Sequence, residues 1–208
     1  MLAVDQRPAT HQRVNTMTIM ILGLLIFLGG HSVRIFAESW RQQQIAARGE
    51  GTWKLAYSAV AVIGLALAIY GYGLTRLDPI HIWFPPMGLR HAVALLMLPA
   101  FIMLAAAYVP RNAIKAKLGH PMMLSVKIWA FAHLLENGRL GDILFFAAFL
   151  VWAILAFKAA KQRSRQHPSA PQATSLPATL ATIAIGVVAY GLFAFYLHGV
   201  LIGVPVFG

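Results

Sequence analysis

The chain has 208 residues, of which 59% are hydrophobic and only 11% are charged, a balance typical of an integral membrane protein and not of a soluble domain. It contains no cysteine, which excludes disulfides, thiolate metal sites, iron–sulfur clusters and covalently attached haem. The formal net charge of +11 would favour nucleic acid in a soluble protein. Here the charges lie in short segments between hydrophobic runs, where the positive-inside rule accounts for them, and we expect no nucleic-acid partner.

The first hydrophobic runs predict membrane-spanning helices. A polar tail, residues 1–16, precedes a run over residues 17–36 that is long enough to cross a hydrocarbon core of ~30 Å. Arg34 near the end of this run argues against a cleaved signal peptide, because small residues precede cleavage sites. A loop is expected up to residue 53, followed by a second span over residues 55–74.

The middle of the chain carries a loop rich in proline and aromatic residues, residues 77–91, which its prolines should keep non-helical. The third span, residues 92–108, contains Pro99 and is expected to kink there. A fourth span begins at Pro121, a residue favoured in the first turn of a helix, and ends near residue 138.

The last part of the chain predicts two more spans, over residues 143–160 and 178–202. Between them, residues 162–177 are rich in proline and small polar residues and are expected to form a flexible linker. We therefore predict an all-α, polytopic membrane protein with about six transmembrane helices. Residues 17–161 and the last helix, within residues 178–208, are expected to form one domain.

The distribution of charged residues favours one orientation of these spans. The loops after spans one, three and five carry about eleven Lys and Arg side chains, against about five on the opposite side, so both termini are expected outside the cytoplasm. The acidic residues beyond the N-terminal tail all fall at span ends, which disfavours a buried proton relay through carboxylates.

Histidines are the candidate site residues, because an ionisable group at membrane depth needs a partner or a ligand. His31, His133 and His198 lie inside predicted spans, and His120 lies at the start of one. Each could be structural, donating to a backbone carbonyl of a neighbouring helix. Imidazole is also the commonest metal ligand. Zinc is disfavoured because cysteines and mid-span carboxylates are missing, and a di-iron site because no Glu has His three residues later.

Haem b, held by coordination alone, is the best metal hypothesis, because it needs only one or two axial side chains. Arg34 follows His31 by one helical turn and could meet a haem propionate. Lys127 could do the same, although extending toward the head groups is an alternative for it. Around His133, Trp129 should pack and Asn137 should supply a hydrogen bond. Judged by position along the predicted spans, His133 and His198 lie at more similar membrane depths than His31 and His133 do.

Several segments together resemble the NnrU family of bacterial membrane proteins, from about Met17 to the C-terminus. They are MILGLLIFLGGHSVRI, GEGTWKLAYS, GHPMMLSVKIWAFAHLLENG and YLHGVLIGVP. The resemblance implies a multi-pass protein of the bacterial inner membrane that is linked to nitrite and nitric oxide metabolism in denitrification. It identifies no catalytic residue.

A plant relative of that family, zeta-carotene isomerase, is a haem b enzyme whose GLHS-type and CLAH-type motifs hold the iron ligands. These motifs match residues 30–32 and 131–133 here, which implies His31 and His133 as the axial pair. The plant enzyme has a further functionally important histidine near the end of span two. This chain has only Tyr70 or Tyr72 there. It also has Gly119 before His120 where the plant form has arginine.

Three functions follow as hypotheses. The first is a haem b protein in nitrogen-oxide metabolism, with redox chemistry or a diatomic gas ligand at the iron. The second is a haem-dependent isomerase of a hydrophobic polyene such as a carotenoid. The third is a non-catalytic assembly factor for a respiratory complex, in which every histidine is structural.

Overall fold

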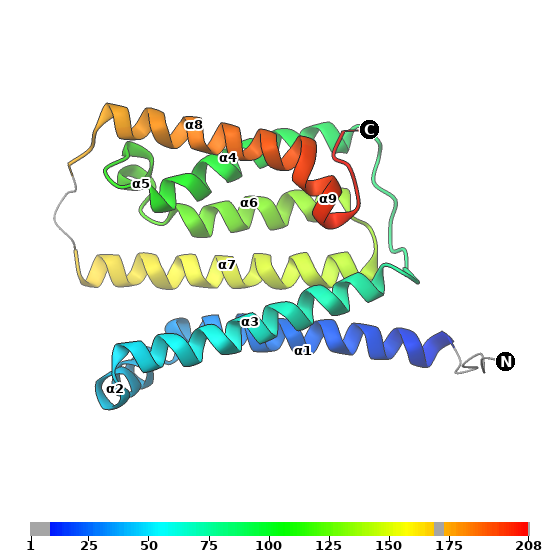
Figure 1. Ribbon diagram of the computed structural model, residues 1–208, viewed down its shortest axis with the longest axis horizontal. Coiled ribbons are helices and arrows are strands. Elements are labelled where there is room, and N and C mark those ends of the chain that lie inside the picture. The colour runs from blue at the N-terminus through cyan, green and yellow to red at the C-terminus, as the bar shows by residue number, and fades with distance from the viewer. Residues whose placement is uncertain (1–8, 169–172, 208) are drawn as a thin grey trace. The chain divides into compact units, whose positions relative to one another are not determined.

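The computed structural model describes residues 9–168 and 173–207, with side chains from residue 15 onward (Figure 1). The described residues form helices and no strand, apart from one isolated antiparallel bridge between His81 and Arg139. The prediction of an all-α protein is therefore confirmed. Part of the predicted polar tail, residues 1–8, lies outside the described residues.

The chain divides into two compact units, which we describe separately. Unit 1 takes the chain up to Trp83 together with Arg139–Ala148, and unit 2 takes Phe84–Gly138 together with Phe149–Gly208. Unit 1 contains α1 (Ala9–Phe36), α2 (Glu38–Arg48), α3 (Glu50–Thr75) and the first residues of α7 (Leu140–Gln166). Unit 2 contains α4 (Leu89–Tyr108), α5 (Ala113–Leu118), α6 (Pro121–Glu136), the rest of α7, α8 (Leu176–Leu192), the π-helix η1 (Phe193–Leu197) and α9 (His198–Ile202).

Close packing of α1 against α3 forms the core of unit 1. A Cβ atom on Gly64 of α3 would lie 2.6 Å from the backbone nitrogen of Phe27 on α1, and one on Gly71 would meet the backbone of Met20. Gly23 of α1 lies in the same way against the backbone of Ala68. Small residues in membrane helices permit such close approach of two backbones, which strengthens their van der Waals contact. The glycine seam, defined by Gly23, Gly64 and Gly71, thus joins the two helices.

The segment between α1 and α3, expected to be a loop, forms the separate helix α2. Its first residue, Glu38, accepts hydrogen bonds from Arg41 at 3.0 Å and from Gln42 at 2.7 Å. Side chains three and four residues apart stabilise a polar helix in this way without a hydrophobic core. Gly49, with φ of 83°, separates α2 from α3 in a conformation that other residues rarely adopt.

A buried carboxylate fastens the beginning of α7 to the end of α3 within unit 1. Asp142, whose side chain is 1% exposed, accepts hydrogen bonds from the Tyr72 hydroxyl at 2.7 Å and from Arg139 Nε at 2.6 Å. Thr75 lies against Gly141, so the two helix ends also approach closely. A charged group buried away from water is tolerated when it is both paired and hydrogen-bonded, as it is here.

In unit 2, α4 packs along both α6 and α8 (Figure 1). Gly186 of α8 permits the closest approach, since its Cβ would lie 2.6 Å from the Cα of Ile102. Asn112 is 1% exposed and fixes the corner after α4. Its Nδ2 donates to the carbonyl of Ala106, and its Oδ1 accepts from the backbone of Lys115 as the N-cap of α5.

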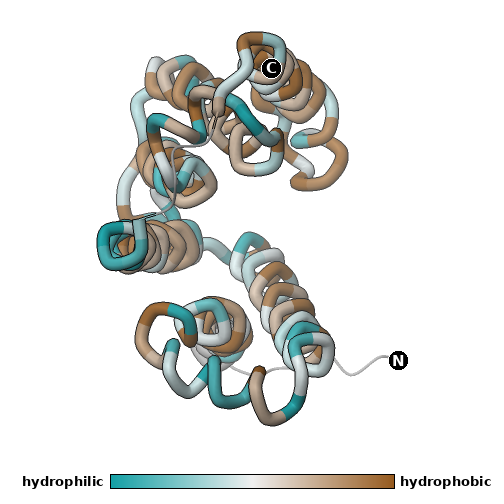
Figure 2. Tube along the Cα trace, turned by 90° about the vertical axis from the view of Figure 1, so that its left-hand side faces the viewer, coloured by the Kyte–Doolittle hydropathy of each residue, from teal (hydrophilic) through white to brown (hydrophobic). Residues whose placement is uncertain are grey.

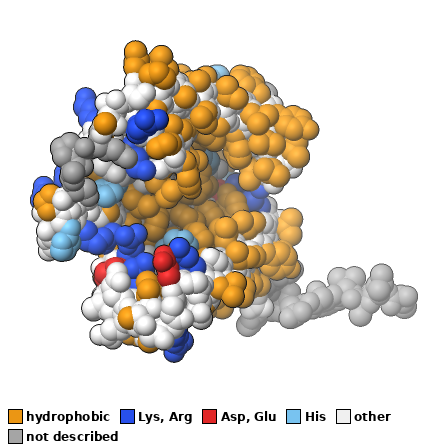
Figure 3. All heavy atoms as spheres, turned by 60° about the vertical axis from the view of Figure 1, so that its left-hand side comes forward, with side chains coloured by type: hydrophobic (Ala, Val, Ile, Leu, Met, Phe, Trp, Pro, Cys, Tyr) orange, Lys and Arg blue, Asp and Glu red, His pale blue; other side chains and the backbone are white. Residues whose placement is uncertain are grey.

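The helices have the dimensions and surface of membrane spans. Among the described residues, five helices are long and apolar enough to cross a bilayer: α1, α3, α4, α7 and the continuous run of α8, η1 and α9. The sixth helix, α6, has 16 residues and a length of about 24 Å. Hydrophobic residues lie on several sides of the helices in Figure 2 and cover broad areas of the surface in Figure 3. A bilayer would solvate such a surface.

Several boundaries differ from the sequence-based expectation, and the helix α1 begins at Ala9, inside the stretch expected to be a polar tail. The helix α3 begins at Glu50, and α7 continues to Gln166, well inside the stretch expected to be a linker. Both extensions are polar, so hydropathy alone does not include them in a span. The helix α4 contains Pro99, as expected for the third span, and the kink there stays a prediction.

We predict that Gly64→Ala weakens the α1–α3 contact, because the added methyl group meets backbone atoms that cannot move aside. Overpacking of this kind costs about 1–3 kcal/mol of unfolding free energy. Denaturation in mixed detergent micelles, followed by circular dichroism, measures it. Gly73→Ala on the same helix is the matched control, because nothing lies within 4 Å of its added Cβ. Equal stability of the two variants would contradict the glycine seam.

We also predict that Asp142→Ala destabilises the protein by about 3 kcal/mol, because removing one partner of a buried ion pair leaves Arg139 and Tyr72 without their acceptor. Glu50→Ala removes an exposed carboxylate that pairs with Lys54, where both side chains are about 70% exposed, and should cause no measurable loss. The same micelle titration compares them. A loss no larger for Asp142→Ala than for Glu50→Ala would rule out a structural role for the buried pair.

Candidate functional site

His31 lies on α1 at the end of the glycine seam. The seam places its imidazole against α3, where the ring centroids of His31 and Tyr57 are 5.2 Å apart. Its Nδ1 is 2.7 Å from the carbonyl oxygen of Phe27, four residues earlier on the same helix. A carbonyl oxygen can only accept, so Nδ1 carries the proton, and in the neutral ring Nε2 bears the lone pair.

His133 has the same arrangement on α6 in unit 2. Its Nδ1 donates to the carbonyl oxygen of Trp129 at 2.8 Å, and the two rings lie 5.4 Å apart. Trp129 in turn packs against Phe149 as a T-shaped pair, with ring centroids 5.3 Å apart. The ring of this half-buried histidine is therefore held in one tautomer, with Nε2 as the acceptor nitrogen.

One detail of the predicted surroundings of these histidines was wrong. The amide of Asn137 donates to the backbone carbonyl of His133 at 2.8 Å, where it satisfies the end of α6, and not to the imidazole. The carbonyl groups that lie against Nδ1 of His31 and His133 belong to each histidine's own helix. Trp129 packs against His133 as expected.

The other predicted site residues make different contacts. His120, before α6, has Nε2 3.1 Å from the Ser164 hydroxyl and its ring edge on Phe157. His198 follows the π-helix, and its Nδ1 donates to the Val204 carbonyl at 2.5 Å. Arg34 is exposed in the last turn of α1, on the same helix as His31. The part of the chain that the structure describes holds no group of three or more His, Asp or Glu side chains suited to a metal ion.

Sequence reasoning missed two features. Asp142 lies at a span end, as predicted, yet it is buried by contacts with Tyr72, which is 70 residues away in sequence. The π-helix over Phe193–Leu197 directly precedes His198, and π-bulges are frequent at functional sites. Neither leaves a local signal, because burial of Asp142 depends on a distant partner and a π-turn has no distinct hydropathy pattern.

Comparison with known proteins complements this geometry. No curated protein and no solved structure matches the chain. A family model described as "NnrU protein" matches residues 19–206, nearly the whole chain. The glycine seam, His31, the helix α6 and the last span all lie within the matched range, and the chain belongs to the NnrU family of proteins.

Proposed function

We propose that this protein binds haem b without covalent attachment, with His31 and His133 as iron ligands, and that the haem serves nitrogen-oxide metabolism. One observation carries the proposal: both histidines donate Nδ1–H to the carbonyl four residues earlier on their own helices. Histidines that bind metals usually direct their second nitrogen to a carbonyl or carboxylate in this way, which sets the tautomer and makes Nε2 more basic.

The surroundings of each ring also suit a flat, hydrophobic cofactor. His31 lies between the aromatic rings of Phe27 and Tyr57, with centroid separations of 4.3 and 5.2 Å. His133 is flanked by Trp129, which is itself supported by Phe149. Aromatic rings offer apolar area with little conformational freedom to lose on binding, while the histidines supply the directional bonds.

Arg34 completes the donor set that the chain offers. It lies one turn from His31 on the same helix and has a guanidinium that can bind a carboxylate with two parallel hydrogen bonds, so we assign it to a haem propionate. When bound, haem b supplies reversible coordination of a diatomic gas or transfer of one electron. The backbone carbonyls of Phe27 and Trp129 would hold the two imidazoles in the neutral tautomer that is protonated at Nδ1, with the lone pair on Nε2.

A second candidate function follows from His198, whose ring makes a similar hydrogen bond in a structural setting. Its Nδ1 also donates to a backbone carbonyl, that of Val204, at a position where the bond closes the turn after α9. A histidine in a membrane protein can therefore use this bond for structure alone. If His31 and His133 do the same, the protein is a non-catalytic assembly factor for a respiratory complex.

The visible spectrum of the detergent-purified protein, made with ample haem, tests the proposal. We expect a Soret band that His31→Ala and His133→Ala each abolish or shift, and that added imidazole restores because it replaces the missing ligand. His167→Ala is the control, since His167 is exposed beyond the end of α7. It should leave the band unchanged.

A protein that folds but has no Soret band after haem is added would overturn the haem proposal and leave the assembly function. A band that survives both substitutions would overturn the assignment of the two histidines. Nitric oxide added to the reduced protein would then show, through a shift of the band, whether the iron binds a diatomic gas.

A further inference from the structure

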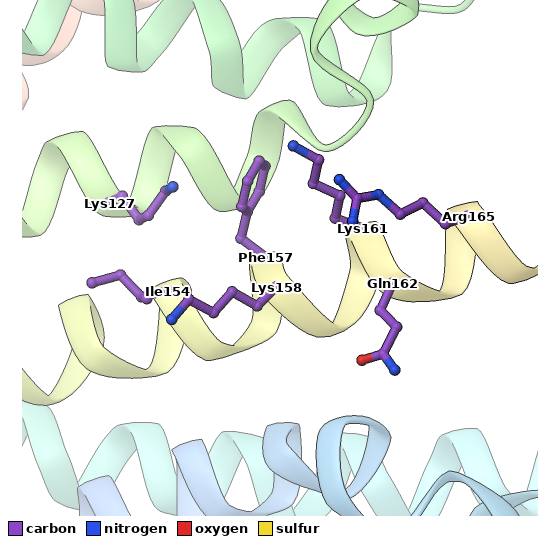
Figure 4. Close-up of a pocket in the computed structure, with 7 residues that line it drawn as sticks. All are labelled: Lys127, Ile154, Phe157, Lys158, Lys161, Gln162 and Arg165. Carbon is purple, nitrogen blue, oxygen red and sulfur yellow. The ribbon is translucent and has the colours of Figure 1, made fainter.

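A basic groove opens on the surface of unit 2, away from the histidines already described. It has a volume of about 600 Å³. One lining residue comes from α6 and the others from α7: Lys127, Ile154, Phe157, Lys158, Lys161, Gln162 and Arg165 (Figure 4). The groove thus combines four cations, one amide and two hydrophobic side chains.

The sequence of α7 places its cations on one face of the helix. Lys158, Lys161 and Arg165 are spaced by three and four residues, so they follow one stripe along α7. The side chains of Lys161 and Arg165 converge in Figure 4, whereas Lys158 points toward Ile154 and Gln162 points to the opposite side of α7. Cations that merely extend to the head groups need no such alignment, since any face of a helix end reaches water.

Lys127 faces this stripe from the neighbouring helix. Its ammonium lies 4.0 Å above the centroid of the Phe157 ring, a cation–π contact that holds the side chain at the groove. Phe157 and Ile154 form the hydrophobic part of the lining. A ligand in the groove therefore meets positive charge from two helices and an apolar surface beside it.

Unit 2 offers these cations almost no internal counter-charge. Its sequence contains nine Lys and Arg residues and a single acidic residue, Glu136. Glu136 is paired with Arg90 at 3.7 Å, and no acidic side chain lines the groove. Four like charges around one groove repel one another, so an anion bound among them is electrostatically favoured.

The groove lies on the basic side of the membrane region. Two contacts join the segments that flank it: the Ser175 backbone donates to the Arg111 carbonyl at 2.8 Å, and His120 bonds to Ser164. The loop after α4 and the end of α7 therefore lie on the same side, together with their Lys and Arg residues. By the positive-inside rule this side is cytoplasmic, where the leaflet carries anionic lipids.

We propose that this groove is a binding site for the phosphate head group of an anionic phospholipid in the cytoplasmic leaflet. Lys161 and Arg165 bind the phosphate oxygens, and Lys158 and Gln162 contact the remaining head-group oxygens from the other edge of the groove. Ile154 and Phe157 contact the beginning of the acyl chains. The binding anchors α7 to α6 through a lipid and is independent of haem.

Thermal stabilisation of the purified full-length protein by added lipid tests the proposal. The probes are phosphatidylglycerol and phosphatidylcholine with the same acyl chains, in detergent, with inorganic phosphate as a third arm. We expect phosphatidylglycerol alone to stabilise the protein. The double variant Lys158→Gln/Lys161→Gln should raise the half-saturating lipid concentration by at least about fivefold, since each cation near an anionic surface contributes substantially to binding.

The double variant Lys117→Gln/Arg163→Gln is the control, because it removes the same net charge from the same side but outside the groove. It should retain the response of the unaltered protein. An equal loss in both double variants would overturn the proposal in favour of a diffuse charge effect. Equal protection by inorganic phosphate would overturn it in favour of a site for free phosphate.

The haem spectrum separates this inference from the proposed function. Lys158→Gln/Lys161→Gln should leave any Soret band unchanged while it abolishes the lipid response. Loss of the band in this variant would show that the cations bind the haem propionates, and the lipid proposal would be overturned.

Discussion

The structure depends on the interactions that hold two helices together in a hydrocarbon environment. Lipid tails are as apolar as leucine side chains, so helices in a bilayer associate through van der Waals packing and polar bonds, not through the hydrophobic effect. Unit 1 uses both means. The glycine seam brings the backbones of α1 and α3 together, and the buried Asp142 fastens α7 to the end of α3. The position of His31 against Tyr57 follows from the same seam.

Hydropathy predicted the membrane helices because a long apolar run in a chain of this composition can form little else than a transmembrane helix. It could not predict α2, whose polar residues make it resemble a loop until the side-chain bonds of Glu38 are known. Helix ends such as that of α7 were missed for the same reason.

The candidate site was less accessible from sequence. Position along the chain identified His31 and His133 as unusual, but not what their rings contact. The partner of each Nδ1 is the helix's own carbonyl, a short-range bond that depends on the side-chain rotamer and leaves no pattern of residues. The burial of Asp142 depends on Tyr72, far away in sequence, so its place at a span end suggested exposure. Local composition cannot report such long-range contacts.

The π-helix in the last span changes which residues share a face of that span. A π-turn closes through bonds to the fifth residue and not the fourth, so one additional residue is accommodated within the same axial rise. Positions before Phe193 and after Leu197 therefore stop sharing a common angular register. His198 therefore points where a continuous α-helix would direct a different residue. Adding or removing one residue in this segment would rotate the end of the helix about its axis without changing its hydropathy.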